Sequence, residues 1–453
     1  MKLNKKLLAT GVLTASLFAG NAFAAVSADE AAKLGDTLTP MGATKAGNGD
    51  EIPAWDGGLP NIPASYKNDG IYVDPFADEE PLFTIDQSNV SEYEDRLSPG
   101  QVAMIKKYSD YKMKVYPTHR TSTYPDDVLE ATVANATEVE LVAGGNGLQN
   151  YQTATPFPIA QNGLEAIWNH ITRYRGGSVS RNVGQVTPTA DGSYSVVKFQ
   201  DELSWRTYLE DYKADEDENV LFYFKQAITA PSRLAGNVLL VHETINQVKE
   251  PRRAWVYNAG QRRVRRAPQV SYDGPGTASD GLRTSDNFDM FNGAPDRYNW
   301  ELMGKKEMYI PYNAYGLTDR SLSYDDIVKP GHINQDLARY ELHRVYHVQA
   351  TLKDGERHIY AKRDFYIDED SWQASVIDHY DGRGELWRVA EAHNMYFYDQ
   401  QVPWYAIETL NDLLSGRYLA LGLTNQERDP YEFGIRRSSR DYTPSALRRS
   451  SRR

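Results

Sequence analysis

The feature that most constrains the fold is a run of alternating apolar and polar residues between positions 340 and 397. In residues 346–352 every second residue is apolar or aromatic, and similar spacing returns in residues 359–367. The turn sequence KDGE at 353–356 joins these two runs, and DGRG at 381–384 joins a further pair. A period of two predicts half-buried strands, and short polar turns between them predict hairpins. We therefore expect a large antiparallel sheet built from consecutive hairpins.

Other segments extend this prediction towards the N-terminus. Residues 219–228 and 237–245 are typical of strands, and a hairpin is expected to turn at 258–260. Helices are expected over residues 99–111, 125–139 and 163–174, and a late one is expected to end near Gly416. The predicted fold class is α+β, a large curved antiparallel sheet with helices over its concave face and an extended N-terminal wrap.

The first 24 residues predict export. Three lysines precede a largely apolar run from Leu7 to Gly20, and Ala22-Phe23-Ala24 has the form of a signal peptidase site. The run is too short to span a membrane as a helix, and no later stretch approaches spanning length. We expect a soluble periplasmic protein divided into a signal peptide (1–24), an irregular and helical wrap (25–120), a curved-sheet domain (121–435) and a disordered basic tail (436–453).

Cysteine and charge exclude several classes of protein. The chain has no cysteine, so neither a lipid anchor on cysteine nor a disulfide framework is expected. Its formal net charge is −12, although the last 18 residues carry seven arginines and one aspartate. An acidic body repels phosphate backbones, so no nucleic-acid partner is expected. The tail is interpreted as a solvated end, with docking to anionic lipid headgroups as the alternative.

No catalytic signature is recognisable in the sequence. Nucleophile-elbow, phosphate-loop and complete dinucleotide-binding patterns are absent, so no catalytic residue and no cofactor is expected. His343 and His347 are four residues apart, but on a strand this spacing separates them by roughly 13 Å. The acidic run 215–218 lacks the glycine and the alternate spacing of a calcium loop. No metal site is therefore expected, although a glycosidase-like pair of carboxylates remains open.

Arginines gather around one expected hairpin. The sequence RRAWVYNAGQRRVRR places six of them around Trp255 and Tyr257. One interpretation is a solvated hairpin that pairs with acidic residues of the body. The other is a docking surface for an acidic partner or a lipid headgroup, because arginine pairs bidentately with carboxylate and phosphate. The candidate docking residues are Arg252, Arg253, Arg262, Arg263, Arg265 and Arg266.

Three polar strips carry a resemblance to a known family. They are LTPMGATKAGNGDEIPAWDGG from Leu38, PLFTIDQSNVSEYEDRLSPGQ from Pro81 and YPTHRT from Tyr116. They resemble domain-of-unknown-function family 1329, a family of Gram-negative periplasmic proteins linked to outer-membrane lipoprotein sorting. The strand segments around 251–268 and 380–389 are similar to the LolA/LolB half-barrel. In that fold, helices close a curved sheet over an apolar groove that holds acyl chains.

The resemblance implies a periplasmic carrier or chaperone for a lipid or another hydrophobic molecule. It further implies possible partnership with a resistance-nodulation-division type exporter and an outer-membrane protein. A hydrolase of polysaccharide or lipid, and a ligand-free accessory protein of an export complex, are the alternatives. Aromatic residues in strand-like segments are the candidate groove lining: Trp205, Phe222, Phe224, Trp255, Tyr257, Tyr346, Phe365, Trp372 and Trp387.

The first strip also yields a structural prediction. Residues 38–58 are rich in turn-forming residues and contain one tryptophan, Trp55. We expect this strip to be largely irregular, to lie across the outside of the sheet and to be held by a mostly buried Trp55.

Overall fold

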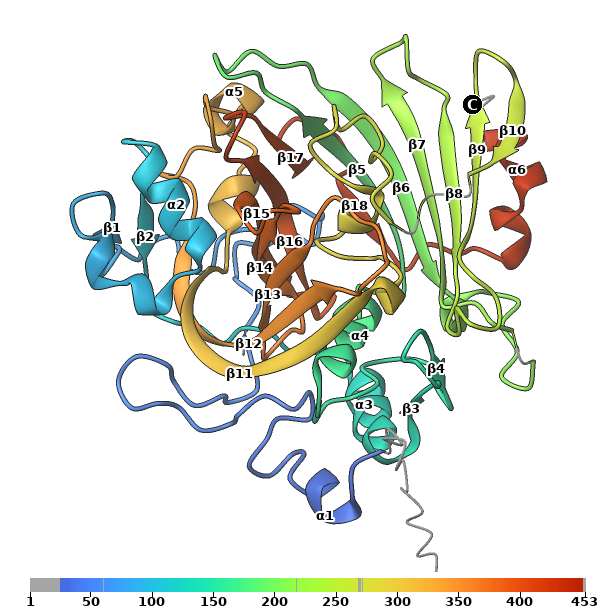
Figure 1. Ribbon diagram of the computed structural model, residues 1–453, viewed down its shortest axis with the longest axis horizontal. Helices are drawn as coiled ribbons and strands as arrows, with labels where there is room; N and C mark the ends of the chain where they lie inside the picture. The colour runs from blue at the N-terminus through green and yellow to red at the C-terminus, as the bar shows by residue number, and fades with distance from the viewer. Residues whose placement is uncertain (1–24, 60, 217, 268–269, 271, 451–453) are drawn as a thin grey trace, which may run out of the picture.

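The chain builds a curved 16-stranded sheet, seen in a computed structural model of the protein (Figure 1). The structure describes residues 25–59, 61–216, 218–267, 270 and 272–450. The expected signal peptide, residues 1–24, lies outside the described residues. Neighbouring strands follow the order β1-β2-β12-β13-β14-β15-β16-β17-β5-β6-β7-β8-β9-β10, with β11 paired to β12 and β18 paired to β5.

The large sheet is antiparallel apart from one parallel bridge between β2 and β12. A separate two-stranded sheet joins β3 and β4. The strands are β1 (Phe83–Ile85), β2 (Met113–Val115), β3 (Glu140–Leu141), β4 (Leu148–Gln149), β5 (Ser178–Val186), β6 (Val197–Trp205), β7 (Phe222–Ala230), β8 (Val238–Glu243), β9 (Arg253–Asn258), β10 (Arg263–Arg266), β11 (Tyr298–Pro311), β12 (Tyr340–Leu352), β13 (Lys362–Asp368), β14 (Ala374–Tyr380), β15 (Leu386–Phe397), β16 (Val402–Asp412), β17 (Tyr418–Leu423) and β18 (Tyr431–Phe433).

Short helices surround the sheet. The α-helices are α1 (Ala28–Ala31), α2 (Pro99–Lys107), α3 (Asp126–Glu138), α4 (Gly163–Thr172), α5 (Tyr324–Ile327) and α6 (Pro444–Ser450). The 3-10 helices are η1 (Val90–Glu92), η2 (Glu94–Arg96), η3 (Arg206–Tyr208), η4 (Ser285–Asn287), η5 (Pro295–Arg297), η6 (Tyr315–Thr318) and η7 (Ser439–Tyr442). Among the described residues, no helix has the length and apolar character that crossing a membrane requires.

The expected hairpins are confirmed. Strands β12 and β13 pair in an antiparallel register across residues 353–361, and β14 and β15 pair across the DGRG turn. Strands β9 and β10 pair across residues 259–262. The α+β fold class with a large curved antiparallel sheet is also confirmed. Strand β17 pairs with β5, which joins the strands of the C-terminal half to those of residues 178–266 in one sheet.

The three longer helices lie where the sequence predicts them. Helix α2 has a capping box, in which Ser98 and Gln101 satisfy each other's backbone N–H groups, and Pro99 occupies its first turn. Helix α4 is capped by Asn162, whose side chain accepts from the Glu165 N–H. It is buried along its length and packs against β11 and β12, inside the curve of the sheet (Figure 1).

The late helix is a wrong prediction. Residues 407–416, expected to be helical, form most of β16 and the turn that follows it. Strand β16 is buried at every position, because one core covers Leu410 and another covers Ile407. A strand buried on both faces loses the polar alternation that distinguishes it from a buried helix.

The basic tail is ordered rather than disordered up to Ser450. Tyr442 is fully buried, and its ring stacks on Tyr223 with centroids 5.1 Å apart. Its hydroxyl lies 2.7 Å from Ser204 Oγ. Arg437 pairs with Glu202 at 3.0 Å. Helix α6 then packs against β8, β9 and β10, on the outer side of the sheet in Figure 1.

The N-terminal strip is largely irregular, as the sequence predicts. It forms isolated bridges and turns, and its buried side chains are those of Thr39, Met41, Ala43 and Ile52. Trp55 is half-buried rather than mostly buried, and its indole N–H donates to the Ser122 carbonyl at 3.2 Å. The smaller apolar residues therefore hold the strip more firmly than the tryptophan does.

Candidate functional site

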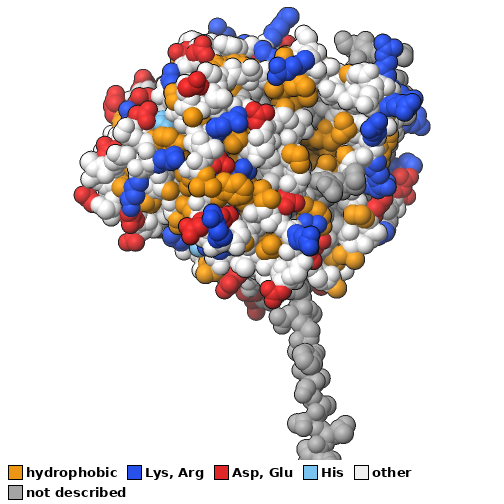
Figure 2. Space-filling model, turned by 45° about the horizontal axis from the view of Figure 1, so that its top comes forward, with side chains coloured by type: hydrophobic (Ala, Val, Ile, Leu, Met, Phe, Trp, Pro, Cys, Tyr) orange, Lys and Arg blue, Asp and Glu red, His pale blue; other side chains and the backbone are white. Residues whose placement is uncertain are grey.

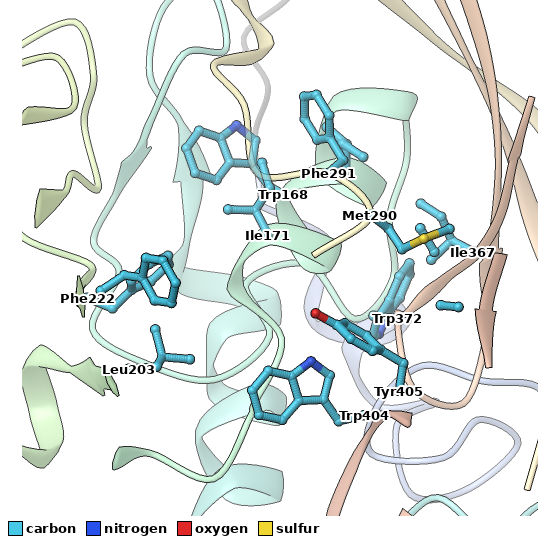
Figure 3. Close-up of a cluster of buried hydrophobic side chains, with 14 of the residues drawn as sticks. Trp168, Ile171, Leu203, Phe222, Met290, Phe291, Ile367, Trp372, Trp404 and Tyr405 are labelled. Atoms are coloured by element: carbon cyan, nitrogen blue, oxygen red, sulfur yellow. The ribbon is translucent and has the colours of Figure 1, made fainter. Parts of the chain in front are cut away.

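A cavity of about 520 Å³ lies against the inner face of β5–β9. Its far wall is an irregular stretch, residues 272–292, which we call the covering segment. Trp404 from β16 completes the wall, and Figure 3 shows this ring facing the same buried region as Leu203 and Phe222. The volume is in the range of small-molecule sites. The sheet thus faces a loop segment here, not the helices that the sequence predicts over a groove.

Strand alternation decides which side chains reach the cavity. On β7, Phe222 and Phe224 line it, whereas Tyr223 between them lies in the outer core beneath the C-terminal tail. Leu239 on β8 and Val256 on β9 follow the same rule. The inner wall is therefore mostly aromatic and aliphatic.

The structure places two of the nine candidate lining residues, Phe222 and Phe224, in the cavity wall. Trp205 packs edge-on against Phe222 at 5.2 Å, in the core beside the cavity. Trp255 and Tyr257 point to the opposite face of β9, where they join the outer core.

The remaining candidates lie further away. Tyr346 and Trp372 stack on each other at 4.7 Å, and Trp372 donates to the Met41 carbonyl of the N-terminal strip. Phe365 packs against Phe291 in the main core. Trp387 donates to Asp412 at 3.0 Å and is half-buried. These residues hold the sheet and its wrap together.

Ion pairs form a polar band in the cavity wall. Arg181 pairs with Asp201 at 3.0 Å, and its guanidinium lies 4.8 Å from the centre of the Trp404 ring. Asp289 accepts from Arg173 at 2.6 Å and also pairs with Arg175. Burial alone would raise the pKa of Asp289, but these two guanidiniums outweigh it and hold that pKa well below its usual range.

One cation in the wall stands apart from these pairs. Arg283 belongs to the covering segment, and its side chain is buried within the cavity wall. Its Nε and Nη1 have no hydrogen-bond partner among the described residues. Burial lowers the pKa of its guanidinium, while Glu408 is the leading influence in the other direction.

The covering segment is anchored to the sheet by two polar residues, Asp286 and Asn287. Asp286 pairs with Arg363 at 2.8 Å and with His358 at 3.0 Å. Asn287 lies 2.7 Å from His379 on β14. Sequence reasoning overlooked this segment, although one signal was available. A long stretch without periodicity between two strands is uncommon in a compact domain and is often functional.

The arginine hairpin is divided by the fold. Arg252 is buried beside the cavity, where it pairs with Glu243 and donates to the Val270 carbonyl at 2.7 Å. Arg253 pairs with Glu250 at 3.1 Å. The other four candidates are exposed: Arg262 in the turn before edge strand β10, and Arg263, Arg265 and Arg266 on that strand. Figure 2 shows basic side chains gathered at this end of the molecule beside apolar ones.

One buried cluster contains residue types that can ligate a metal ion. Ligand atoms of His343, Asp368 and Asp370 lie within 4.8 Å of one another. Asp370, however, accepts two hydrogen bonds from Arg120, at 2.6 and 2.9 Å. Burial, and after it the neighbouring Asp370, raise the pKa of Asp368 to about 7. An arginine bound to one carboxylate and a partly protonated second carboxyl make this cluster a structural network rather than a cation site.

A second hollow, of about 930 Å³, separates the N-terminal strip from residues 118–121. Two of the side chains that line it already have partners, since His119 lies 2.6 Å from Glu79 and Arg120 pairs with Asp370. The cavity beneath the covering segment is the better candidate, because aromatic walls and a polar band converge there.

The sequence and the structure are similar to those of several known proteins. The model of the family described as protein of unknown function (DUF1329) matches residues 84–448. The uncharacterized protein PA3922 of Pseudomonas aeruginosa is 69% identical over 450 residues, which cover 99% of each chain. Two solved structures are also similar, at low sequence identity.

The first is a candidate outer membrane lipoprotein-sorting protein domain from Vibrio parahaemolyticus. It is 13% identical, with a TM-score of 0.43, over 63% of this chain and 98% of that one. The second is the LolA superfamily protein NE2245 from Nitrosomonas europaea, which is 14% identical, with a TM-score of 0.37, over 63% of this chain and 98% of that one.

Proposed function

We propose that this chain, which belongs to the DUF1329 family, is a periplasmic carrier or chaperone of hydrophobic molecules. It would bind a lipid or similar molecule without covalent chemistry and support its transfer towards the outer membrane. An exporter of the resistance-nodulation-division type and an outer-membrane protein are the proposed partners. The observation that carries the proposal is the cavity of about 520 Å³ with aromatic and aliphatic walls.

Burial of apolar surface supplies the driving force. Each methylene group buried contributes about 0.8 kcal/mol, so ten of them contribute about 8 kcal/mol before the entropic costs of association. Phe222, Phe224, Leu239 and Val256 offer such a surface on the sheet side. This driving force needs no catalytic group, and binding remains reversible.

The state of the cavity carboxylates argues against the hydrolase alternative. Asp201 pairs with Arg181 and also accepts from Gln226 at 3.0 Å, and Asp289 is held between two arginines. A glycosidase-type mechanism needs one carboxyl group free to donate a proton and another free to attack or to activate water. Both cavity carboxylates are instead engaged in ion pairs.

A cavity-filling substitution tests the proposal. Leu239→Trp places a bulky ring in the cavity, so we expect it to weaken binding of the neutral fluorescent probe N-phenyl-1-naphthylamine at least tenfold. Val248→Trp is the control, because Val248 is 66% exposed and does not line the cavity. Fluorescence titration of both full-length variants measures the effect. Absence of probe binding to the wild-type protein, or equal binding by the two variants, would contradict the proposal.

A further inference from the structure

The unpaired Arg283 distinguishes this cavity from a simple apolar pocket. Arg283 is 3% exposed, and its guanidinium forms no ion pair within 4.0 Å among the described residues. The other cavity arginines each have a carboxylate partner. Burying a cation without a partner is costly, so a buried guanidinium normally has an anion beside it.

The carboxyl group that most favours the charged form of Arg283, that of Glu408, does not form an ion pair with it. Glu408 on β16 is buried, and burial raises the pKa of its carboxyl group to about 7, with Arg283 as the main opposing influence. Glu408 Oε2 lacks a hydrogen-bond partner, and no ion pair joins it to Arg283 within the described part of the chain. Asp201 is already engaged by Arg181 and Gln226. The protein itself thus leaves the guanidinium without a direct counter-ion.

Polar and apolar side chains line different parts of the cavity around Arg283. Its guanidinium carbon lies 5.4 Å from the centre of the Phe288 ring. Arg181 and its ion-pair partner Asp201 line the same cavity as Arg283, while apolar side chains of β7, β8 and β9 form another part of its wall. A molecule with one anionic end and one hydrocarbon end matches this division.

We propose that the cavity binds a single-chain anionic amphiphile, with a carboxylate paired to Arg283 and the acyl chain packed against Phe222, Phe224 and Leu239. The inference rests on the proposed carrier function and specifies the class of ligand. A guanidinium presents parallel N–H groups that match the two oxygens of a carboxylate. The cavity volume suits one chain of a small ligand rather than a larger molecule.

This pairing predicts a preference that depends on the headgroup. A neutral molecule with the same chain leaves the buried guanidinium without a counter-ion, whereas a carboxylate forms charge-assisted hydrogen bonds with it. Bonds of this kind should make the affinity for the carboxylate roughly 10- to 100-fold higher than for the neutral molecule. A cationic headgroup adds repulsion and is expected to bind more weakly than a neutral one.

Displacement of N-phenyl-1-naphthylamine from the full-length protein tests the inference. The competitors are laurate and dodecyltrimethylammonium, each below its critical micelle concentration, and 1-dodecanol below its solubility limit. The expected order of affinity is laurate, then dodecanol, then the cation. Arg283→Met is expected to lower laurate affinity at least tenfold and to change probe and dodecanol affinity by less than twofold. Arg265→Met, on exposed strand β10, is the matched control.

A second measurement needs no ligand. Replacing an unpaired buried cation by methionine removes a desolvation cost, so Arg283→Met is expected to raise the midpoint of thermal unfolding of the free protein. The wild-type order of the three competitors stands as a test even if this variant does not fold.

The outcomes separate the two proposals. If the probe does not bind the wild-type protein, the carrier function itself fails. The anionic-ligand inference fails if the probe and dodecanol bind but laurate binds no more tightly than dodecanol. It also fails if Arg283→Met still binds laurate more tightly than dodecanol. In both cases the carrier function stands.

Discussion

Asp378 is a carboxyl group that the fold buries completely beneath the start of α2. Its two oxygens accept from Ser98 Oγ at 3.0 Å and from the Gly100 N–H at 3.1 Å. Burial nevertheless raises its pKa to about 7. At the residue scale, such a group makes the stability of the protein depend on pH in a direction opposite to that of a salt-bridged carboxylate.

The sign of this dependence follows from proton binding. Between the unfolded pKa of about 4 and the folded value of about 7, the folded protein holds the proton of Asp378 and the unfolded chain does not. Asp378 therefore makes the free energy of unfolding decrease as pH rises through this window, by up to about 1.4 kcal/mol per pH unit.

Asp378→Asn should remove this contribution, because the amide keeps a similar shape and does not titrate. We expect the variant to gain stability relative to the wild-type protein as pH increases from 4 to 8. Urea unfolding at several pH values measures the difference. Asp354→Asn, in an exposed turn, is the control and should follow the wild-type curve. A constant difference between Asp378→Asn and the wild type across this range would refute the assignment.

At the scale of elements, the C-terminal tail acts as a cover for the outer face of β7–β10. Tyr442 and Leu447 complete a buried cluster with Tyr223 and Leu240. Composition alone suggested disorder, since arginine and serine dominate the tail. Its buried apolar residues, Tyr442, Ala446 and Leu447, are too few to give a periodic signal. Their contribution becomes clear only when the sheet face beneath them is known.

Tyr442→Ala should detach this cover. Loss of a fully buried aromatic ring costs about 3 kcal/mol or more, so the free energy of unfolding should decrease by that amount. Exposure of the outer apolar cluster should also increase binding of the dye ANS. Arg440→Ala, in the same 3-10 helix but exposed, is the control and should change stability by less than about 0.5 kcal/mol. A tail that remains undocked in solution would give equal stabilities for the two variants.

Other elements show where sequence reasoning succeeds and where it fails. The turns at 258–260 and 381–384 were predicted correctly, because a hairpin turn is specified by a few neighbouring residues. Strand β16 was mistaken for a helix because both of its faces are buried, and that depends on distant segments. The cavity residues were hardest to predict. Phe224 and Trp255 lie in equally strand-like sequences, yet the pairing register places them on opposite faces.

At the scale of the whole molecule, the pairing of β17 with β5 unites the two groups of hairpins. Gly422 lies at a register shift in this pairing, at a φ of +111°. An added Cβ would come within 2.3 Å of the Ala406 carbonyl oxygen on β16. Close approach of the backbones, as well as the positive φ, therefore requires glycine here.

Gly422→Ala should destabilise the entire sheet by about 2–4 kcal/mol, through overpacking and backbone strain together. Gly355→Ala is the matched control, because Gly355 also has a positive φ of +85° but its added Cβ would meet nothing within 4 Å. The control should lose about 1 kcal/mol. Far-UV circular dichroism and tryptophan fluorescence, followed in the same urea titration, measure both variants. Equal losses would show that the two groups of hairpins do not depend on this contact.

The pairing of β17 with β5 also sets an order of events during synthesis. The wall from β5 to β9 leaves the ribosome long before Trp404 and β17 follow. The cavity therefore cannot be complete until almost the entire chain has been made, and its closure depends on contacts between segments far apart in sequence, which form slowly. Until then the aromatic residues of β7 remain uncovered, and a general chaperone would meet the chain in that state.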